Sequence, residues 1–326
     1  MTSSAVLRTA VLVPCYNEEA AIAKVVADFR RTLPDAEIYV YDNNSSDKTV
    51  AVARQAGAIV RTEPLQGKGN VVRRMFADVE ADIYVLVDGD DTYDAASAPK
   101  MIAALRGSTL DMVNGSRVTD IQKAYRPGHR FGNWLLSSMV SWIFGNRFSD
   151  LLSGYRVMSR RYVKSFPALS AGFETETELT VHALELRMPI AEIATPYKDR
   201  PEGSVSKLST FKDGFRILWT IIVLVKEERP MQFFSLLALF LSLIGAALIV
   251  PIVIEFLQTG LVPRLPTAVL SMGLVILGFL SLTCGLILDT VTRGRQEMKR
   301  MRYLNIPAPP ALDAAKHQTV DESAIL

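Results

Sequence analysis

Cysteine is scarce in this sequence of 326 residues. The two cysteines, Cys15 and Cys284, stand far apart in unlike surroundings and match neither a metal-ligand spacing nor a disulfide framework. Their scarcity excludes a small fold stapled by disulfides and fits a reducing compartment.

An excess of charge of one sign is also lacking. The 36 Lys and Arg residues nearly balance the 34 Asp and Glu residues, for a net charge of +2, so nucleic acid is not an expected partner. The N-terminal apolar stretch is short and leads into Glu18 and Glu19, so we expect no signal peptide. No internal repeat of 20–50 residues is visible, which excludes a repeat architecture.

Two long uncharged runs stand out near the C-terminal end. Phe233–Ile254 and Thr267–Leu288 each hold 22 residues without a charge. As helices they would span about 33 Å, enough to cross a hydrocarbon core of about 30 Å. The linker is short and contains Gly260, Pro263 and Pro266, so we expect a transmembrane hairpin. A buried helical hairpin in a soluble core is the alternative.

Basic residues flank this hairpin on both sides. Lys226 and Arg229 precede it, and the linker has only Arg264. The basic residues that follow it are Arg293, Arg295, Lys299, Arg300 and Arg302. The positive-inside rule therefore predicts a multi-pass protein of the cytoplasmic (inner) membrane, with both termini and everything before residue 226 cytoplasmic.

The first 210 residues alternate between short apolar strands and helices. Strands are expected at 10–13, 37–41, 58–61, 82–88 and 111–116, and helices at 20–31, 49–55, 67–79 and 99–106. This alternation predicts an α/β fold with a mostly parallel, Rossmann-like sheet and right-handed crossovers.

The strand at 82–88 runs into the acidic cluster Asp88-Gly89-Asp90-Asp91. The carboxyl edge of a parallel sheet is where an α/β protein places a ligand. Carboxylates at i and i+2 around a glycine suit Mg²⁺ or Mn²⁺ carrying a diphosphate, although a solvated acidic turn is the alternative. Two other strands end at Asn17/Glu18 and Asp42/Asn44, so all three polar ends can converge on one ligand.

Four motifs together carry a family resemblance. They are Pro14-x-Tyr16-Asn17-Glu18, Asp42-Asn43-Asn44-Ser45-Ser46-Asp47-Lys48-Thr49, Gly67-Lys68-Gly69 and Asp88-Gly89-Asp90. In this order, each at a strand end, they resemble the family 2 glycosyltransferases with the GT-A fold, over roughly residues 8–210. Further segments are similar to the polyprenyl-phosphate (dolichol-phosphate type) sugar synthases, whose members often carry a C-terminal membrane hairpin. These segments are Asn114-Gly115-Ser116-Arg117, Ser153-Gly154-Tyr155-Arg156 and Arg200…Ser206-Lys207-Leu208.

The resemblance implies roles for individual residues. Those expected to bind the nucleotide-sugar donor are Pro14, Tyr16, Glu18, Asp42, Asn44, Lys68, Asp88, Gly89, Arg200 and Lys207. Asp88 and Asp90 would hold Mg²⁺ or Mn²⁺. The acceptor phosphate would face Arg117, Arg126, Arg130 and Ser153, and the residues expected to be catalytic are Asp90, Arg117 and Arg130.

Two departures from the family pattern affect these assignments. The usual second-strand Asp-Asp-Gly-Ser reads Asp42-Asn43-Asn44-Ser45 here, which leaves the base and ribose contacts open. A third acid, Asp91, and then Thr92 follow the acidic pair, which leaves the second metal ligand open.

The nature of the acceptor decides whether a general base is needed. A lipid monophosphate is already largely dianionic at pH 7, so it needs cations more than deprotonation. The segment 126–134 supplies such cations, and 134–144 reads as an aromatic-rich helix suited to a bilayer surface or to the core. His129 is expected to be solvated or capping. Glu174, Glu176 and Glu178 head a helix, where most would be N-terminal charges and Glu176 a contact to the acceptor or an arginine.

The expected organisation has four parts. They are a GT-A domain at 1–210, an interfacial amphipathic helix at 211–230, two transmembrane helices at 231–290 and a cytoplasmic basic segment and tail at 291–326. Ser281-x-x-x-Gly285 is a small-residue spacing that could pack helices within the hairpin or in a homo-oligomer.

The leading functional hypothesis is an inverting glycosyltransferase. It would pass a sugar from a nucleotide-diphosphate sugar, with UDP favoured, to a polyprenyl phosphate such as undecaprenyl phosphate for cell-envelope glycan or glycolipid modification. A GDP-mannose-dependent polyprenyl-phosphate mannose synthase and a transferase that acts on a glycolipid hydroxyl with Glu176 as base are the alternatives. A processive polysaccharide synthase is disfavoured because its Gln-x-x-Arg-Trp motif is missing, and a decayed scaffold because the acidic and basic positions are intact.

Overall fold

The computed structural model describes residues 7–118, 150–172, 174–200, 219 and 222–308. These residues form two compact units. The first unit holds the described residues up to 200 together with 299–308, and the second holds 219 and 222–298.

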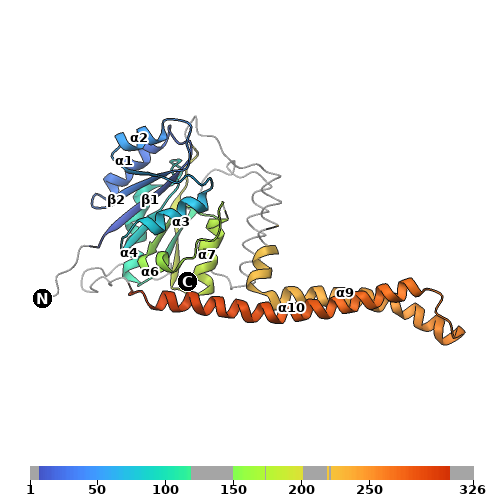
Figure 1. The fold of residues 1–326 in the computed structure, drawn as a ribbon. Helices are drawn as coiled ribbons and strands as arrows, with labels where there is room; N and C mark the ends of the chain where they lie inside the picture. Colours follow the sequence, from blue (N-terminus) through green and yellow to red (C-terminus); the bar gives the residue numbers. More distant parts are fainter. Residues whose placement is uncertain (1–6, 119–149, 173, 201–218, 220–221, 309–326) are drawn as a thin grey trace. The chain divides into compact units, whose positions relative to one another are not determined.

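The first unit is built on a sheet that is covered by helices (Figure 1). Among the described residues the sheet has seven strands, in the order β3-β2-β1-β4-β6-β5-β7. The strands are β1 (Thr9–Cys15), β2 (Glu37–Asp42), β3 (Ile59–Thr62), β4 (Ile83–Leu86), β5 (Met112–Val118), β6 (Arg156–Ser159) and β7 (Ile190–Pro196). Every pairing is parallel except those of β6, which runs antiparallel to β4 and β5. The mostly parallel α/β sheet predicted from the sequence is confirmed, and β6 and β7 are additions to it.

Helices connect and cover these strands. They are α1 (Ile22–Thr32), α2 (Thr49–Gln55), α3 (Lys68–Asp78), α4 (Ala98–Gly107), α6 (Arg160–Ser165) and α7 (Thr175–Glu185), with a short 3₁₀ turn, η1 (Ala95–Ser97). The helices expected at 20–31, 49–55, 67–79 and 99–106 each match one of these within two residues at either end.

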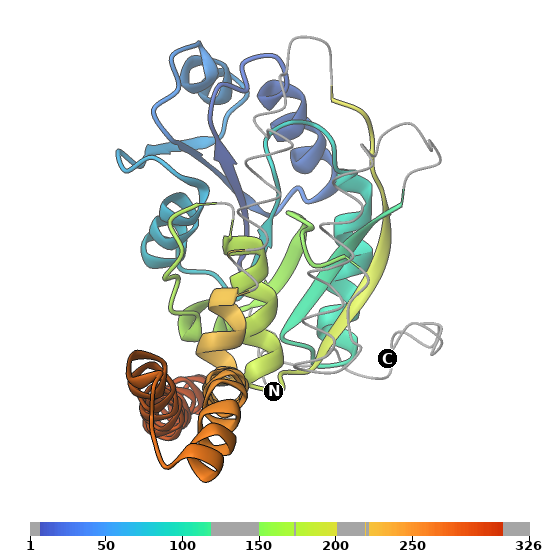
Figure 2. The same ribbon diagram turned by 90° about the vertical axis from the view of Figure 1, so that its right-hand side faces the viewer.

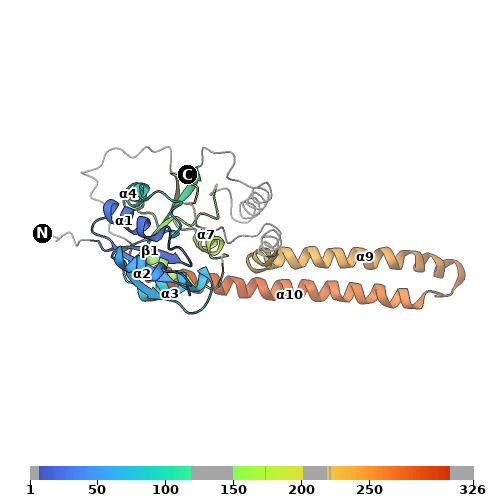
Figure 3. The ribbon, with the colours of Figure 1, turned by 90° about the horizontal axis from the view of Figure 1, so that it is seen from above.

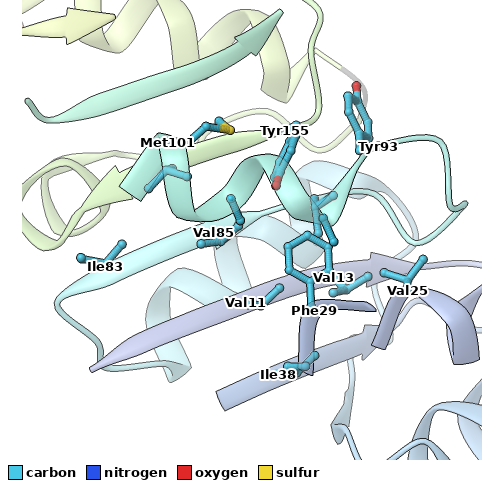
Figure 4. Close-up of a cluster of buried hydrophobic side chains, with 14 of the residues drawn as sticks. Val11, Val13, Val25, Phe29, Ile38, Ile83, Val85, Tyr93, Met101 and Tyr155 are labelled. Carbon is cyan, nitrogen blue, oxygen red and sulfur yellow. The ribbon is translucent and has the colours of Figure 1, made fainter. Parts of the chain in front are cut away.

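A continuous apolar core lies between one face of the sheet and α1, α2 and α4 (Figure 4). Alternate strand residues such as Val11, Val13 and Val85 point to this side, where they meet Phe29 of α1 and Met101 of α4. Because side chains alternate along a strand, the residues between them are buried on the opposite face. This two-sided burial explains why the strands read as unbroken apolar runs.

Helices α3, α6 and α7 lie on the opposite face of the sheet (Figure 2). Phe76 of α3 packs edge-on against Tyr84 of β4 and against Phe166. His182 of α7 packs against Tyr162 and Phe166, and burial lowers its pKa to about 3. Helices packed on both faces hold the sheet in place. The sheet in turn positions the loops at its carboxyl edge.

The second unit is a hairpin of two long helices, α9 (Pro230–Thr259) and α10 (Leu265–Leu304), which run side by side (Figure 3). Both are long and apolar enough to cross a membrane, as the two uncharged runs predict. Small residues set the contact: the Ser271 hydroxyl donates to the Gly245 carbonyl at 2.7 Å, and a Cβ on Gly285 would lie 3.0 Å from Cβ of Phe234. Gly285 of the Ser281-x-x-x-Gly285 spacing therefore packs within the hairpin.

The last turns of α10 belong to the first unit. Lys299 pairs with Glu185 of α7 at 2.6 Å, and the Tyr303 hydroxyl donates to the buried carboxylate of Asp111 at 2.6 Å. Part of the segment expected to be a juxtamembrane tail is thus ordered helix. Of the expected interfacial helix, residues 222–228 are helical and most of the remainder lies outside the described residues.

Candidate active site

A cavity of about 290 Å³ opens at the carboxyl edge of the sheet, where β1, β2 and β4 end. It is lined by Pro14, Cys15, Tyr16, Glu18, Asn43, Gln66, Gly67, Lys68, Val71, Asp88, Gly89, Asp90 and Arg200. Most residues expected to bind the donor are therefore brought together, although Asp42 and Asn44 do not line the cavity. The lining residues that were not predicted from the sequence are Cys15, Asn43, Gln66, Gly67 and Val71.

The loops after β1 and β2 brace each other. The Asn17 backbone N–H donates to the Ser45 hydroxyl at 2.9 Å, and the Ser46 N–H returns a bond to Oδ1 of Asn17 at 2.8 Å. The N–H of Glu18 donates to the hydroxyl of Thr49 at 2.9 Å. The polar motifs at these two strand ends thus fix the shape of the cavity wall in addition to any contact with a ligand.

The two asparagines that depart from the family pattern have a structural role. The Asn43 amide donates to the carbonyls of Glu63 and Leu65, both at 2.8 Å, and its oxygen accepts from the Gly67 N–H at 2.7 Å. The Asn44 amide donates to the Pro64 carbonyl at 2.8 Å. An aspartate has no side-chain donor when ionised, so Asn-Asn here ties the loop after β2 to the loop after β3. Oδ1 of Asp42 is buried and has no hydrogen-bond partner within the described residues.

The glycines of Gly67-Lys68-Gly69 serve close packing at the start of α3. A Cβ on Gly67 would lie 2.2 Å from the Ala171 carbonyl oxygen, and one on Gly69 would lie 2.1 Å from that of Ser170. The Gly69 N–H donates to the Gly172 carbonyl at 3.1 Å. The first N–H groups of α3 thus meet protein carbonyls, and the motif brings the segment before α7 next to Lys68.

Lys68 forms the centre of a buried charge cluster. Its Nζ lies 2.5 Å from Oδ1 of Asp88 and 2.5 Å from Oε1 of Glu176. The Lys68 side chain is 10% exposed and that of Glu176 8%. Burial alone would lower the pKa of Lys68, but the two carboxylates outweigh it and the pKa is raised, so the lysine stays charged. Three elements, α3, the end of β4 and α7, meet at this one ammonium group.

Asp90 lies in the same wall and is held through both oxygens. Its Oδ1 accepts from the Thr92 hydroxyl at 2.6 Å, and its Oδ2 pairs with Nη2 of Arg200 at 2.7 Å. Burial, followed by the charge of Asp88, raises the pKa of Asp90, while Thr92 and Arg200 oppose this shift. The third acid, Asp91, turns to Lys24 at 2.9 Å and Lys198 at 3.8 Å. Asp91 does not line the cavity, so it is less suited than Asp88 or Asp90 to bind a cation there.

Gly89 and Gly154 let the backbone close around the acidic pair. A Cβ on Gly89 would lie 2.6 Å from Sγ of Cys15, and one on Gly154 would lie 2.4 Å from Oδ2 of Asp88. The Gly154 N–H donates to the Tyr93 hydroxyl at 2.8 Å. Any larger residue at either position would displace Asp88 or the end of β1.

Comparisons with known proteins agree with this geometry. Residues 10–165 match the glycosyl transferase family 2. Over 301 residues the chain is 32% identical to glycosyltransferase AglJ of Haloferax volcanii, covering 90% of this chain and 97% of that protein.

The chain belongs to glycosyl transferase family 2.

Two further likenesses extend the comparison. The family 2 glycosyltransferase is 29% identical to a dolichyl-phosphate hexose transferase of Haloferax volcanii over 220 residues, which is 68% of this chain and 95% of that protein. Its fold resembles the crystal structure of glucosyl-3-phosphoglycerate synthase from Mycobacterium tuberculosis in complex with Mn²⁺, UDP and glucosyl-3-phosphoglycerate. The TM-score is 0.54 at 23% identity, covering 68% of this chain and 79% of that one. The expected GT-A fold and transferase activity are confirmed.

The structure places some of the residues that the resemblance predicts to face the acceptor. Arg117 forms a bidentate pair with Asp150, with Nε to Oδ2 at 2.7 Å and Nη2 to Oδ1 at 2.8 Å, and its guanidinium lies 5.5 Å from the ring centre of Tyr197. Ser153 is fully buried, and its hydroxyl donates to the Gly115 carbonyl at 2.5 Å. A direct bond from Ser153 to an acceptor phosphate would require that contact to open. Arg126, Arg130 and Lys207 lie outside the described residues.

Arg156 is a positioning residue that the sequence reasoning did not single out. It is fully buried and donates to the carbonyls of Leu151 at 2.9 Å, Ser153 at 3.2 Å and Glu176 at 2.9 Å. Burial lowers its pKa. The guanidinium therefore ties the loop before β6 to the first turn of α7, next to the carboxylate that pairs with Lys68. Its place in the Ser153-Gly154-Tyr155-Arg156 segment was its signal in the sequence, but that segment gave Arg156 no role of its own.

The cavity residues fit a divalent cation bound together with a diphosphate. Among the described residues, no group of three or more His, Cys, Asp or Glu side chains could hold a metal by itself. Asp88 and Asp90, the two carboxylates that the resemblance predicts to hold the metal, both line the cavity, and Oδ2 of Asp90 faces the guanidinium of Arg200 there. Hard oxygen ligands of this kind suit Mg²⁺ or Mn²⁺, which commonly complete their shells with phosphate oxygens and water.

Proposed function

We propose that this glycosyltransferase moves a sugar, with inversion, from a nucleotide-diphosphate sugar to a polyprenyl phosphate at the cytoplasmic face of a membrane. The observation that carries this proposal is the cavity in which Asp88, Asp90, Lys68 and Arg200 face one another, in a chain that also has two helices able to cross a membrane. The dolichyl-phosphate hexose transferase to which the chain is similar supports a lipid phosphate as acceptor.

In this proposal Asp90 would hold a divalent cation, with Asp88 beside it. Such a cation would act as a Lewis acid on the leaving diphosphate. Pro14, Tyr16 and Glu18 would contact the nucleotide, and Arg200, with Lys207, would add charge-assisted hydrogen bonds to the diphosphate. Lys68 would fix the orientation of the Asp88 carboxylate through their 2.5 Å contact. A UDP-sugar is the favoured donor, and a GDP-sugar is the alternative.

The arrangement around Glu176 favours a phosphate over a hydroxyl as nucleophile. A hydroxyl needs a general base, for which Glu176 is the candidate. In the structure its Oε1 is already engaged by the Lys68 ammonium at 2.5 Å, so this oxygen is not open to a substrate hydroxyl. A phosphate monoester is already anionic at neutral pH, so cations such as Arg117, Arg126 and Arg130 suffice to orient it.

The function is tested by supplying membranes that contain the protein with radiolabelled UDP- or GDP-sugars and undecaprenyl phosphate. We expect label to enter a lipid product that is released by mild acid. Undecaprenol, which has a hydroxyl in place of the phosphate, is the matched control and should accept no sugar. Transfer to undecaprenol or to an added glycolipid, without transfer to the phosphate, would contradict the proposal.

The Arg117→Ala substitution should impair use of the lipid phosphate. Removing a charge-assisted contact worth about 1.5–3 kcal/mol predicts a loss of roughly 10- to 150-fold in kcat/KM for the acceptor, with donor binding intact. Because Asp150 holds Arg117, the Asp150→Asn variant is the control: it weakens the pair but leaves the guanidinium in place. Initial rates at varied lipid phosphate distinguish acceptor binding by Arg117 from a structural role in the pair with Asp150. Equal losses of activity in both variants, with an unchanged KM for the acceptor, would show that Arg117 is purely structural.

The membrane orientation follows from the basic flanks of the hairpin. A cysteine at Thr259, close to the linker between α9 and α10, should react with an impermeant maleimide on intact cells. A cysteine at Lys100, exposed on α4, should react only after permeabilisation. The parent chain reports the background from Cys15 and Cys284. The reverse labelling pattern would refute the proposed orientation.

A further inference from the structure

Both oxygens of the Asp90 carboxylate are already occupied in the structure. Oδ1 accepts from the hydroxyl of Thr92 at 2.6 Å and from its backbone N–H at 3.3 Å, and Oδ2 pairs with Nη2 of Arg200 at 2.7 Å. The Asp90 side chain is 6% exposed and that of Arg200 31%. Asp90 and Arg200 both line the cavity, so their ion pair is part of its wall.

The neighbouring acids are also engaged by cationic side chains. Oδ1 of Asp88 is held by Lys68 at 2.5 Å, and Asp91 turns to Lys24 and Lys198. A cation that binds Asp90 from the cavity would therefore have to use Oδ2, the oxygen that is paired with Arg200. A guanidinium and a divalent ion repel each other, and both bind most strongly along the lone pairs of the same oxygen.

We propose that Arg200 and the divalent cation compete for Oδ2 of Asp90, so that the arginine occupies the metal position until nucleotide arrives. This inference rests on the proposed function. The diphosphate of the donor carries enough negative charge to engage both cations, so it brings the metal to Asp90 and gives the released guanidinium a new partner. Arg200 thereby makes metal binding depend on nucleotide, and the cation and the donor enter together.

The competition is tested by Mn²⁺ titrations of the full-length chain in detergent, with free Mn²⁺ followed by electron paramagnetic resonance. Without nucleotide, Arg200→Gln should bind Mn²⁺ about three- to tenfold more tightly than the unaltered chain, a range reduced because the arginine is partly exposed. Added UDP should tighten Mn²⁺ binding strongly in the unaltered chain and much less in the variant. Lys198→Gln, which removes a nearby cation paired with Asp91 at 3.8 Å, is the matched control and should behave like the unaltered chain.

The outcomes separate this inference from the proposed function. If UDP promotes Mn²⁺ binding and sugar transfer proceeds, but Arg200→Gln has the unaltered Mn²⁺ affinity without UDP, only the competition is wrong. If the unaltered chain binds no Mn²⁺ even with UDP, both the assignment of a divalent cation to Asp90 and its competition with Arg200 are wrong. Arg200→Lys keeps a cation at this position and should retain the low nucleotide-free affinity, which guards against a glutamine variant that folds poorly.

Discussion

Replacing Asp90 by asparagine is expected to lower sugar transfer by about 10³-fold or more, because its carboxylate is the proposed ligand of the divalent cation. Lewis-acid stabilisation of a leaving diphosphate is worth several kcal/mol, and about 1.4 kcal/mol corresponds to a factor of ten in rate. The amide oxygen of the new side chain could still accept the hydrogen bond from Thr92, so the loop should keep its shape and the hairpin should still insert in the membrane. Initial rates at saturating donor and Mn²⁺ measure the effect.

Asp91→Asn is the matched control for this variant. It makes the same chemical change one residue away, at a side chain that pairs with Lys24 and Lys198. Asp91 has a φ of 57°, a backbone conformation that asparagine also tolerates, so this variant should keep most of its activity. EDTA should abolish the activity of the unaltered chain reversibly. Full activity of Asp90→Asn, or full activity in EDTA without added metal, would sink the assignment of Asp90.

Much of the cavity lining could be predicted because its residues lie at the ends of apolar strands. The runs before Asn17, Asp42 and Asp88 are buried on both faces of the sheet, and parallel strands necessarily bring such ends to one edge. The hairpin of two long apolar helices could also be predicted, because a charge-free run of 22 residues is rare outside membrane-spanning helices. In both cases a local pattern determines the structure.

The residues that were missed owe their roles to contacts between distant segments. β6 has four residues and pairs antiparallel between β4 and β5, so its local pattern carries almost no signal. Asn43 and Asn44 appeared as departures from a ligand-binding motif, but their amides hold a loop some twenty residues away. The partnership of Lys68 with Glu176 depends on the packing of two glycines against the segment before α7, which no spacing in the sequence reveals.

The cluster around Lys68 predicts a second large effect, on the stability of the first unit. In Lys68→Met, the carboxylates of Asp88 and Glu176, each 2.5 Å from the same nitrogen in the structure, would be left without their shared cation. Removing one partner of a buried ion pair costs about 3–5 kcal/mol, and the lower end applies here because Asp88 is 28% exposed. For a domain of this size, about 3 kcal/mol corresponds to a fall of roughly 6–12 °C in Tm.

The pattern across variants distinguishes charge from packing in this cluster. Glu176→Gln leaves a neutral pair of Lys68 and Asp88, so its fall in Tm should be less than half that of Lys68→Met. The double variant that combines Lys68→Met with Glu176→Gln has one unpaired charge fewer than Lys68→Met, so it should be more stable than Lys68→Met alone. In Lys68→Met the two unpaired carboxylates repel each other while both are ionised, and protonating one of them relieves this repulsion. The loss of stability in Lys68→Met should therefore shrink as the pH falls from 8 toward 5. Lys100→Met, at an exposed lysine of α4, controls for the loss of a surface charge. A double variant less stable than both single variants, with no dependence on pH, would show that Lys68 acts through packing instead.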